Sequence, residues 1–329
     1  MIIVIKMSNL KSTITSINQV SLHLAQKIFQ KLGTNFQQIL QIISQKFLAS
    51  YLKGKILRAK EIFEQAKETP KWLGWSELIS LQRQFPFTPR FDYSEKNLKQ
   101  RGEKRALEIL KLIKPKKRQI ISFLDIGCGY GMTCTALQKY GKKTTGIDIV
   151  DFFDKRAINS GAKFFKMDAT DLKFENESFD FVFSHDTFQY FTYPEKVLQE
   201  AIRVVKKNGF IFFSFGPLYM SPHGRHAYRS ITIPYCHILF PNELIEKFIE
   251  EKGLKQLADV SYNNWTLENF HKLWESYSHQ LEMIKYKEFS DLTHLDLVMK
   301  YPSCFKSKTK NFKNLIISGM SVLFKRIGK

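Results

Sequence analysis

An apolar segment runs directly into three alternating glycines at Phe123-Leu124-Asp125-Ile126-Gly127-Cys128-Gly129-Tyr130-Gly131. Glycines at every second position after a buried strand allow a sharp turn and let backbone amides approach a ligand closely. The dinucleotide fingerprint G-x-G-x-x-G would need a glycine at position 132, which is Met132. The loop therefore predicts a ligand held by backbone amides, and its spacing disfavours NAD and FAD.

Short apolar strands alternate with helices on both sides of this loop. We expect strands at 119–126, 144–149, 163–167, 179–184 and 209–215, and helices at 17–67 (with a break at Gly33-Thr34), 95–113, 132–140, 194–207 and 241–252. Residues 70–89 read as irregular and aromatic, and the period-two pattern of 314–326 predicts a final strand. This alternation is typical of an α/β fold with a largely parallel sheet covered on both faces.

Residues 125–131 resemble motif I of the class I S-adenosylmethionine-dependent methyltransferases. Asp148 ends the next strand, where this family has an acid that binds the ribose, and Asp168 follows the third strand, where the family's acid meets the adenine amino group. Residues 179–184 and 198–209 match the fourth strand and the following helix. The resemblance covers about 119–216, and its nearest branch includes quinone-biosynthesis methyltransferases.

The resemblance implies a Rossmann-like seven-stranded sheet whose last strand lies antiparallel beside the fifth, with N-terminal helices and a C-terminal substrate lid. It also implies S-adenosylmethionine as cofactor, held by Asp125, Gly127, Cys128, Gly129, Gly131, Asp148, Ile149, Asp168, Ala169 and Ser184. One departure is Lys207-Asn208-Gly209 in place of the family's Pro-Gly-Gly, and the turn survives because asparagine tolerates positive φ. Cys128 reads as a small packing residue of the loop rather than a reactive thiol.

Methyl transfer to oxygen or nitrogen requires a base near the ends of strands four and five. His185 and Asp186 follow strand four and are candidates for the base or for substrate ligands. The alternative is that they cap the next helix or line the cofactor pocket. His223 and His226, in the loop after strand five, are the preferred general bases because neutral histidine accepts protons near pH 7. The alternative is a lid whose polar side chains satisfy one another.

Substrate contacts are expected from the same lid and from the segment before strand one. The predicted substrate-binding residues are Tyr93, Arg101, Arg225, Tyr228 and His237. A metal site of His223, His226 and His237 lacks a completing carboxylate or cysteine pattern, so no metal is predicted. Strand four also lacks the Asn/Asp-Pro-Pro motif of amine methylation, and no Pro-Cys nucleophile occurs, so the sequence disfavours a nucleic-acid substrate.

The net charge of +20 is concentrated at the chain ends. Residues 1–60 carry nine lysines and arginines and no acid, 300–329 carry eight and no acid, and the residues between are almost neutral. Only 1–60 therefore remains a candidate for peripheral contact with an anionic membrane. Four cysteines without a regular spacing predict reduced thiols and a cytoplasmic protein, in contact at most with the inner face of the membrane.

Five segments are predicted: an N-terminal helical extension (1–75), a pre-core segment with a cap helix (76–118), the S-adenosylmethionine-binding core (119–217), a substrate lid and insertion (218–312), and a final strand and tail (313–329). The predicted function is methyl transfer to a small-molecule or glycan acceptor, at oxygen. A membrane-associated lipid or quinone methyltransferase, and a non-catalytic interaction protein that retains the fold, are the alternatives. The sequence leaves the oligomeric state open.

Overall fold

The computed structural model describes residues 34–86, 92–114, 119–226, 230–254 and 263–328, with side chains from Ser50 onward. The chain forms two compact units, 1–58 and 59–329. Helix α2 (Thr34–Gln65) supplies the described part of the first unit. The second unit includes the end of α2, where Ala59 and Phe63 are buried and the Phe63 ring lies 5.7 Å from that of Phe312.

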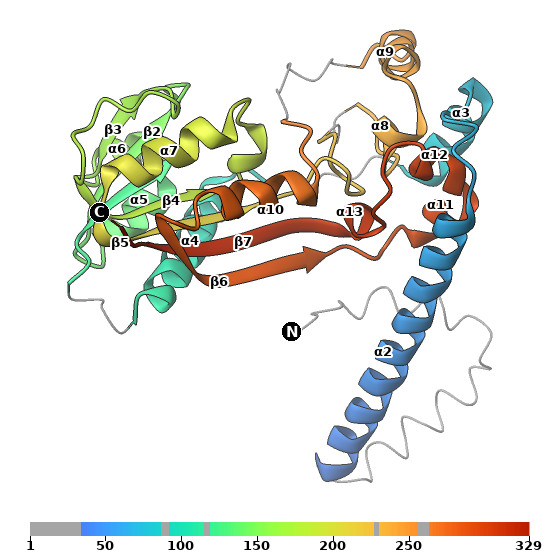
Figure 1. Cartoon of the computed structure of the whole chain (residues 1–329), viewed down its shortest axis with the longest axis horizontal. Helices are drawn as coiled ribbons and strands as arrows, with labels where there is room; N and C mark the ends of the chain where they lie inside the picture. Colours follow the sequence, from blue (N-terminus) through green and yellow to red (C-terminus); the bar gives the residue numbers. More distant parts are fainter. Residues whose placement is uncertain (1–33, 87–91, 115–118, 227–229, 255–262, 329) are drawn as a thin grey trace. The chain divides into compact units, whose positions relative to one another are not determined.

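The second unit is built on a seven-stranded sheet in the order β3-β2-β1-β4-β5-β7-β6 (Figure 1). The strands are β1 (Ser122–Ile126), β2 (Lys143–Asp148), β3 (Lys163–Lys166), β4 (Phe179–His185), β5 (Val205–Phe215), β6 (Leu281–Ser290) and β7 (Ile317–Arg326). The first five are parallel, while β7 runs antiparallel between β5 and β6. The predicted sheet and its terminal antiparallel strand are therefore confirmed.

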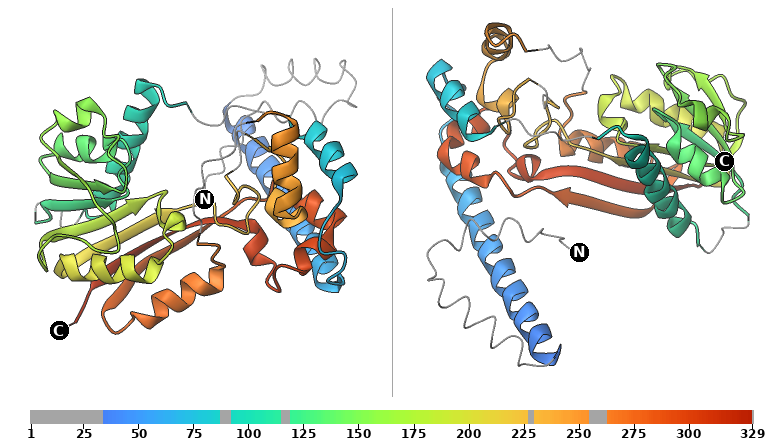
Figure 2. Two further views of the ribbon diagram at one scale, coloured as in Figure 1. Left: turned by 90° about the horizontal axis from the view of Figure 1, so that it is seen from above. Right: turned by 180° about the vertical axis from the view of Figure 1, so that it is seen from behind.

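Helices cover both faces of this sheet. The described helices after α2 are α3 (Trp75–Gln84), α4 (Glu95–Leu112), α5 (Met132–Gln138), α6 (Lys155–Ile158), the short 3₁₀ turn η3 (Phe188–Tyr190), α7 (Pro194–Val204), α8 (Cys236–Leu239), α9 (Asn242–Glu251), α10 (Leu267–Ser276), α11 (Leu295–Lys300), α12 (Pro302–Lys306) and α13 (Lys313–Ile316). Figure 2 shows α7 and α10 on one face of the sheet and α4 on the other.

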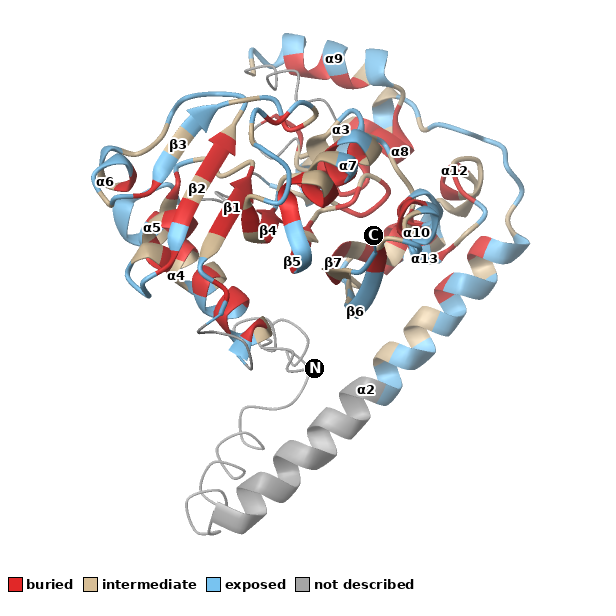
Figure 3. Ribbon diagram, turned by 60° about the vertical axis from the view of Figure 1, so that its left-hand side comes forward, coloured by how far each residue is buried: buried red, intermediate tan, exposed pale blue. Residues whose placement is uncertain are grey.

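Side chains alternate across the strands, so each strand feeds two apolar cores. Phe123, Phe181 and Phe183 pack beneath α4 and α5. The opposite face packs Leu124 and Val182 against α7 and α10. Figure 3 shows this burial concentrated in β1, β2 and β4, so the central strands form a rigid base for the loops at their carboxyl ends.

Helix α4 approaches α5 unusually closely. A Cβ atom placed on Gly102 of α4 would lie 2.5 Å from the carbonyl oxygen of Met132, the first residue of α5. Only glycine fits at this crossing. Because α5 follows Gly131 directly, this contact also fixes the end of the glycine loop.

Several elements differ from the sequence-based prediction, and three of them, α3, α10 and β6, are large. The aromatic segment 70–89 contains helix α3, and the predicted lid and insertion (218–312) contains α10 and β6. Strand β6 joins the sheet beside β7, so this segment contributes to the core as well as to the lid. Its sequence gives little sign of this, because an edge strand with solvent-exposed residues needs no continuous apolar pattern. At the predicted Lys-Asn-Gly turn Asn208 has φ 62°, as expected.

Candidate active site

The glycine loop follows β1 and turns over the end of β2. The amides of Gly127 and Cys128 both donate to the carbonyl of Ile147 over 2.9 Å. Gly127, Gly129 and Gly131 have φ of 75°, 52° and 77°, a region that favours glycine. A Cβ atom on Gly127 would also lie 2.3 Å from the side chain of Thr187. The loop is thus fixed by backbone bonds and by the absence of side chains.

Two carboxylates that the resemblance assigns to the cofactor are held in place at the strand ends. Asp148 accepts a hydrogen bond over 2.9 Å from the amide of Gly129, and so links β2 to the loop. Asp168 accepts from both the amide and the hydroxyl of Thr170, each over 2.8 Å. Both groups are therefore oriented before any ligand binds.

Asp125 differs, because it is buried beneath the loop and only 3% exposed. Burial raises the pKa of its carboxyl group to about 7, and the nearby charge of Arg105 opposes this shift. Cys128 packs against Gly146, where an added Cβ would lie 2.8 Å from its sulfur. Burial raises the pKa of this thiol, which supports a packing role.

The loop has room for a ligand at its middle glycine. A Cβ atom on Gly129 would have no other atom within 4 Å. Beside it, Ile149 is 68% exposed at the end of β2, an apolar surface suited to a flat aromatic base. Ala169 is buried, and Ser184 is fully buried with a hydroxyl that has no hydrogen-bond partner among the described residues. Two oriented carboxylates, an open glycine backbone and an apolar surface together fit a cofactor that carries a ribose and a flat base, as S-adenosylmethionine does.

Tyr93 and Arg101 lie together beside the glycine loop. The Arg101 guanidinium is 5.6 Å from the centre of the Tyr93 ring, which in turn lies 6.2 Å from the Tyr130 ring. Tyr130 contacts Phe152 at 5.5 Å. The two predicted substrate residues therefore lie at the cofactor loop rather than in the lid pocket described below.

His185 and Asp186 end β4 but point to different surroundings. The His185 ring is buried between Phe183 and Phe212 under α4, and Glu108 Oε2 lies 3.7 Å from its Nε2. Burial lowers the pKa of His185, so it is neutral. The His185 ring is thus enclosed by aromatic side chains, and its predicted role as base or substrate ligand stays a prediction. Asp186 has φ 53° and forms an ion pair with Arg105.

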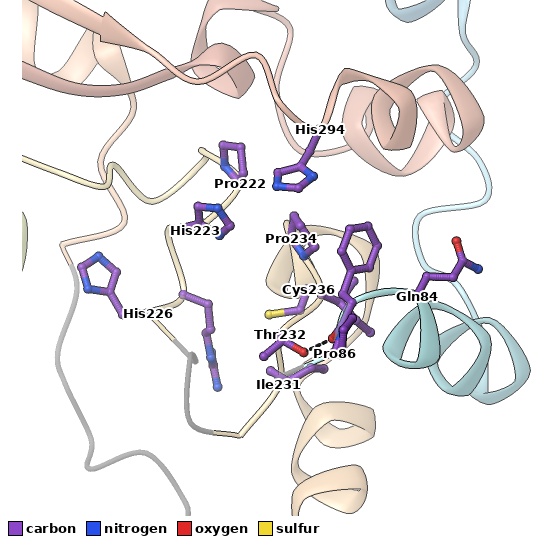
Figure 4. Close-up of a pocket in the computed structure, with 13 residues that line it drawn as sticks. Gln84, Pro86, Pro222, His223, His226, Ile231, Thr232, Pro234, Cys236 and His294 are labelled. Atoms are coloured by element: carbon purple, nitrogen blue, oxygen red, sulfur yellow. Dashed lines mark hydrogen bonds between the residues drawn. The ribbon is translucent and has the colours of Figure 1, made fainter. Parts of the chain in front are cut away.

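A pocket of about 250 Å³ lies within the lid (Figure 4). Its walls come from the end of α3, the loop after β5, α8 and the loop before α11, namely Gln84, Phe85, Pro86, Pro222, His223, Arg225, His226, Ile231, Thr232, Ile233, Pro234, Cys236 and His294. Thr232 joins two of these walls, since its amide donates to Gln82 Oε1 over 3.2 Å and its hydroxyl bonds to the Phe85 carbonyl. Two preferred bases and Arg225 thus share one cavity.

His226 connects this pocket to the end of β4. Its Nδ1 is hydrogen-bonded to the hydroxyl of Tyr190 in η3, and its Nε2 lies 3.3 Å from the Pro217 carbonyl. A carbonyl only accepts, so Nε2 carries the proton and Nδ1 accepts from the tyrosine. His226 has φ 54°, and strained backbone at a non-glycine residue often marks a functional site.

A chain of contacts runs from the glycine loop to His226. Thr187 donates to the Gly127 carbonyl over 3.1 Å. Gln189 then donates to the carbonyls of Asp186 and Gly216, each over 3.1 Å. The end of β4, the end of β5 and the lid are therefore held as one assembly.

His223 faces a carboxylate that the sequence did not indicate. Its Nε2 lies 3.9 Å from Asp291 Oδ2. Asp291 Oδ1 accepts from the amide and hydroxyl of Thr293 over 3.0 and 2.6 Å, which directs the other oxygen toward the histidine. The turn-forming pair Asp291 and Thr293 was visible in the sequence, but its position opposite His223 depends on the fold.

The remaining predicted substrate-binding residues, Arg225, His237 and Tyr228, differ in their positions. Arg225 lines the pocket and donates to Asn242 Oδ1 over 2.6 Å. His237 instead is buried, hydrogen-bonds the Tyr219 carbonyl and packs on the Tyr219 ring, so it stabilises the lid. Tyr228 lies outside the described residues. The sequence missed Tyr190, Asp291 and His294, which come from two separate segments, η3 and the loop before α11.

The described residues contain neither a metal-binding cluster nor a membrane-spanning helix. Histidine, cysteine, aspartate and glutamate do not gather there in any group of three or more that could hold a metal ion. Across the same ranges, no helix combines the length and apolarity needed to cross a membrane.

Comparison with known proteins matches residues 124–213 to a family model described as a methyltransferase domain. A ubiquinone biosynthesis O-methyltransferase of Nitrosomonas europaea is 30% identical over 144 residues, 41% of this chain and 60% of that protein. A sterol 4-C-methyltransferase of Caenorhabditis elegans is 30% identical over 94 residues, but these cover 26% of this chain and only 28% of that protein.

Solved structures of similar fold include the PH0226 protein of Pyrococcus horikoshii OT3, with 18% identity, a TM-score of 0.45 and coverage of 71% of this chain and 93% of that one. A putative sarcosine dimethylglycine methyltransferase of Galdieria sulphuraria has 16% identity, a TM-score of 0.43 and coverage of 68% and 85%. The matched segment contains the glycine loop and the strands β1 to β4 with most of β5. Residues 124–213 are the core of a class I S-adenosylmethionine-dependent methyltransferase domain, and S-adenosylmethionine is its cofactor.

Proposed function

We propose that this protein transfers a methyl group to an oxygen atom of a small-molecule or glycan acceptor held in the lid pocket. The observation that carries the proposal is the pocket itself. It places His223 and His226 around one cavity, and Tyr190 ties His226 to the segment that follows β4. In parallel α/β sheets, ligands bind at the carboxyl ends of the strands, which is where this segment begins.

When bound, S-adenosylmethionine supplies a methyl group on a sulfonium, which is ready for displacement without metal or redox chemistry. The protein must align the acceptor oxygen, remove its proton and exclude water. Gly127, Gly129, Asp148 and Asp168 would hold the cofactor. The lid pocket would hold the acceptor.

His223 is the better candidate for the general base. In the proposed arrangement Nε2–H points to Asp291, which fixes the tautomer and stabilises the imidazolium that forms when Nδ1 takes the acceptor's proton. His226 has both ring nitrogens engaged, with Tyr190 and Pro217. His226 therefore orients Tyr190 at the mouth of the site.

A second candidate function is methylation of a lipid or quinone by a protein bound at the membrane surface. Two observations favour it: the acid-free basic segment 1–60, and relatives named for ubiquinone biosynthesis and for a sterol. All four cysteines are free, which agrees with a reducing cytoplasm. On this proposal the protein lies at the inner face of the membrane.

Two measurements test these proposals in sequence. Calorimetry with S-adenosylhomocysteine should show micromolar binding, and its absence would leave only the non-catalytic interaction protein. Cell extract incubated with methyl-labelled S-adenosylmethionine and the enzyme should then yield one labelled product. A water-soluble product supports the first function, whereas a product in the lipid phase supports the second.

A further inference from the structure

The walls of the lid pocket are basic on one side and apolar on the other. Among the described residues that line it, Arg225, His223, His226 and His294 supply cationic or proton-accepting nitrogens, and none is aspartate or glutamate. Figure 4 shows His223 and His294 projecting near one another, across from Ile231 and Thr232. The apolar side is formed by Phe85, Pro86, Ile231, Ile233, Pro234 and Cys236.

Asp291 and Asn242 are the polar groups that contact His223 and Arg225 on this basic side. Asp291 approaches His223, and its other oxygen is already bonded by Thr293. Arg225 donates to the neutral Asn242, and in the described part of the chain it makes no ion pair with a carboxylate. Arg225 is half-buried, so its charge acts in a medium that screens less than water.

The field of Arg225 reaches its buried neighbours. Burial raises the pKa of Tyr219, and the charge of Arg225 opposes that shift. Burial also lowers the pKa of His237 to about 4, and the charge of Arg225 acts in the same direction. The pocket is therefore electropositive before a ligand enters.

A neutral ligand would displace the water around Arg225 without providing a charged partner for the guanidinium, and burying an uncompensated charge costs free energy. An oxyanion offsets that cost, since a guanidinium binds carboxylate or phosphate oxygens through paired, charge-assisted hydrogen bonds. The volume of about 250 Å³ suits a compact molecule. It is smaller than the roughly 300–1,000 Å³ of common ligand pockets.

From these observations we propose that the lid pocket binds a compact acceptor with an apolar body and an oxyanion group, a carboxylate or a phosphate, and that Arg225 recognises this group. The inference rests on the proposed function, because it takes the lid pocket as the acceptor site. The apolar wall would hold the body, and the methyl-accepting oxygen would face His223.

Benzoate and phenyl phosphate are suitable probes, with benzamide as the neutral counterpart of benzoate. Each is titrated by calorimetry into the full-length protein saturated with S-adenosylhomocysteine. At least one anion should bind ten times more tightly than benzamide. Arg225→Gln should abolish that difference, whereas Arg83→Gln, the same charge change at an exposed position of α3 outside the pocket, should preserve it.

The outcomes separate the two proposals. If S-adenosylhomocysteine does not bind, the proposed function fails first. If it binds equally to wild type, Arg225→Gln and Arg83→Gln, the fold and cofactor site are intact and the probes decide the inference. Affinity for both anions no greater than that for benzamide, no binding of either anion at millimolar concentration, or unchanged anion affinity in Arg225→Gln would each overturn it. Preference for phosphate over carboxylate would identify which oxyanion is recognised.

Discussion

Folding raises the pKa of the Asp125 carboxyl group into the neutral range. Its carboxyl has a pKa of about 7 in the folded protein and 3.8 as an ordinary aspartate, because it is buried under the glycine loop. Between these values the unfolded chain releases a proton that the folded chain retains, so Asp125 makes folding less favourable as pH rises from about 4 to 7. The full effect is about 4 kcal/mol, from about 1.4 kcal/mol per pKa unit.

Asp125→Asn should remove this pH dependence. Urea unfolding without cofactor, at pH 4.5 and pH 7.5, gives the free energy of unfolding of both proteins. The variant's free energy minus that of wild type should increase by about 2–4 kcal/mol between these pH values. Other titrating groups contribute equally to both proteins and cancel. A difference that stays constant with pH would show that Asp125 is ionised in the folded state.

His223 and Asp291 should act as a pair in turnover. Removing a general base costs about 10²–10⁴-fold in rate, so His223→Gln should lower kcat by at least 100-fold. Asp291→Asn should lower it less, about tenfold, because the histidine remains but loses its orientation. Methyl incorporation into the extract acceptor measures both, and S-adenosylhomocysteine affinity should stay unchanged. His279→Gln, at an exposed position, is the control. Undiminished turnover in His223→Gln would contradict the role of His223 as general base and would assign that role to the Tyr190–His226 pair.

At the scale of elements, the crossing of α4 and α5 depends on Gly102. Alanine there would place its Cβ 2.5 Å from the Met132 carbonyl oxygen. Overpacking costs about 1–3 kcal/mol, more than the ~1 kcal/mol that alanine gains over glycine in a helix. Gly102→Ala should therefore lower Tm and weaken S-adenosylhomocysteine binding, because α5 begins directly after Gly131.

Gly54 offers a matched comparison. It also lies within a helix, α2, but a Cβ there would meet no atom within 4 Å. Gly54→Ala should leave Tm unchanged or raise it by a few degrees, and cofactor binding should not change. If Gly102→Ala behaves like Gly54→Ala in calorimetric melting, the two helices do not pack as closely as described.

The same scale shows which elements a sequence can predict. Strands β1 and β4 and the second half of β5 are largely buried, so they read as apolar runs and were placed within a few residues. Strand β6 lies at the sheet edge and carries exposed Glu282, Lys285 and Lys287. Its own sequence therefore lacks the apolar pattern of a strand, although it pairs with β7. Helix α3 was not predicted, because the prolines and aromatic residues around it make segment 70–89 look irregular.

For the second unit as a whole, the cofactor site and the acceptor site differ in how far they can be predicted. The cofactor loop is one continuous segment with fixed spacing, so its residues could be named from the sequence. The lid pocket draws on α3, the loop after β5, α8 and the loop before α11, which are adjacent only after folding. His294 and Asp291 could not be assigned to His223 from spacing because about seventy residues separate them.

The charge of the whole chain leads to a prediction about membranes. Residues 1–60 carry nine basic groups and no acid, and each lysine or arginine near an anionic bilayer contributes about 1 kcal/mol. The full-length protein should float with phosphatidylglycerol-containing vesicles at low salt and be released at 0.5 M NaCl, since salt screens the attraction. Replacing three of these groups by glutamine, at Lys46, Lys53 and Arg58, should weaken vesicle binding by about two orders of magnitude.

The control replaces three exposed lysines of α4, at Lys96, Lys99 and Lys111. Equal loss in both variants would mean that net charge alone drives binding, whereas no flotation of the wild type would remove the membrane from the proposed function and favour a water-soluble acceptor.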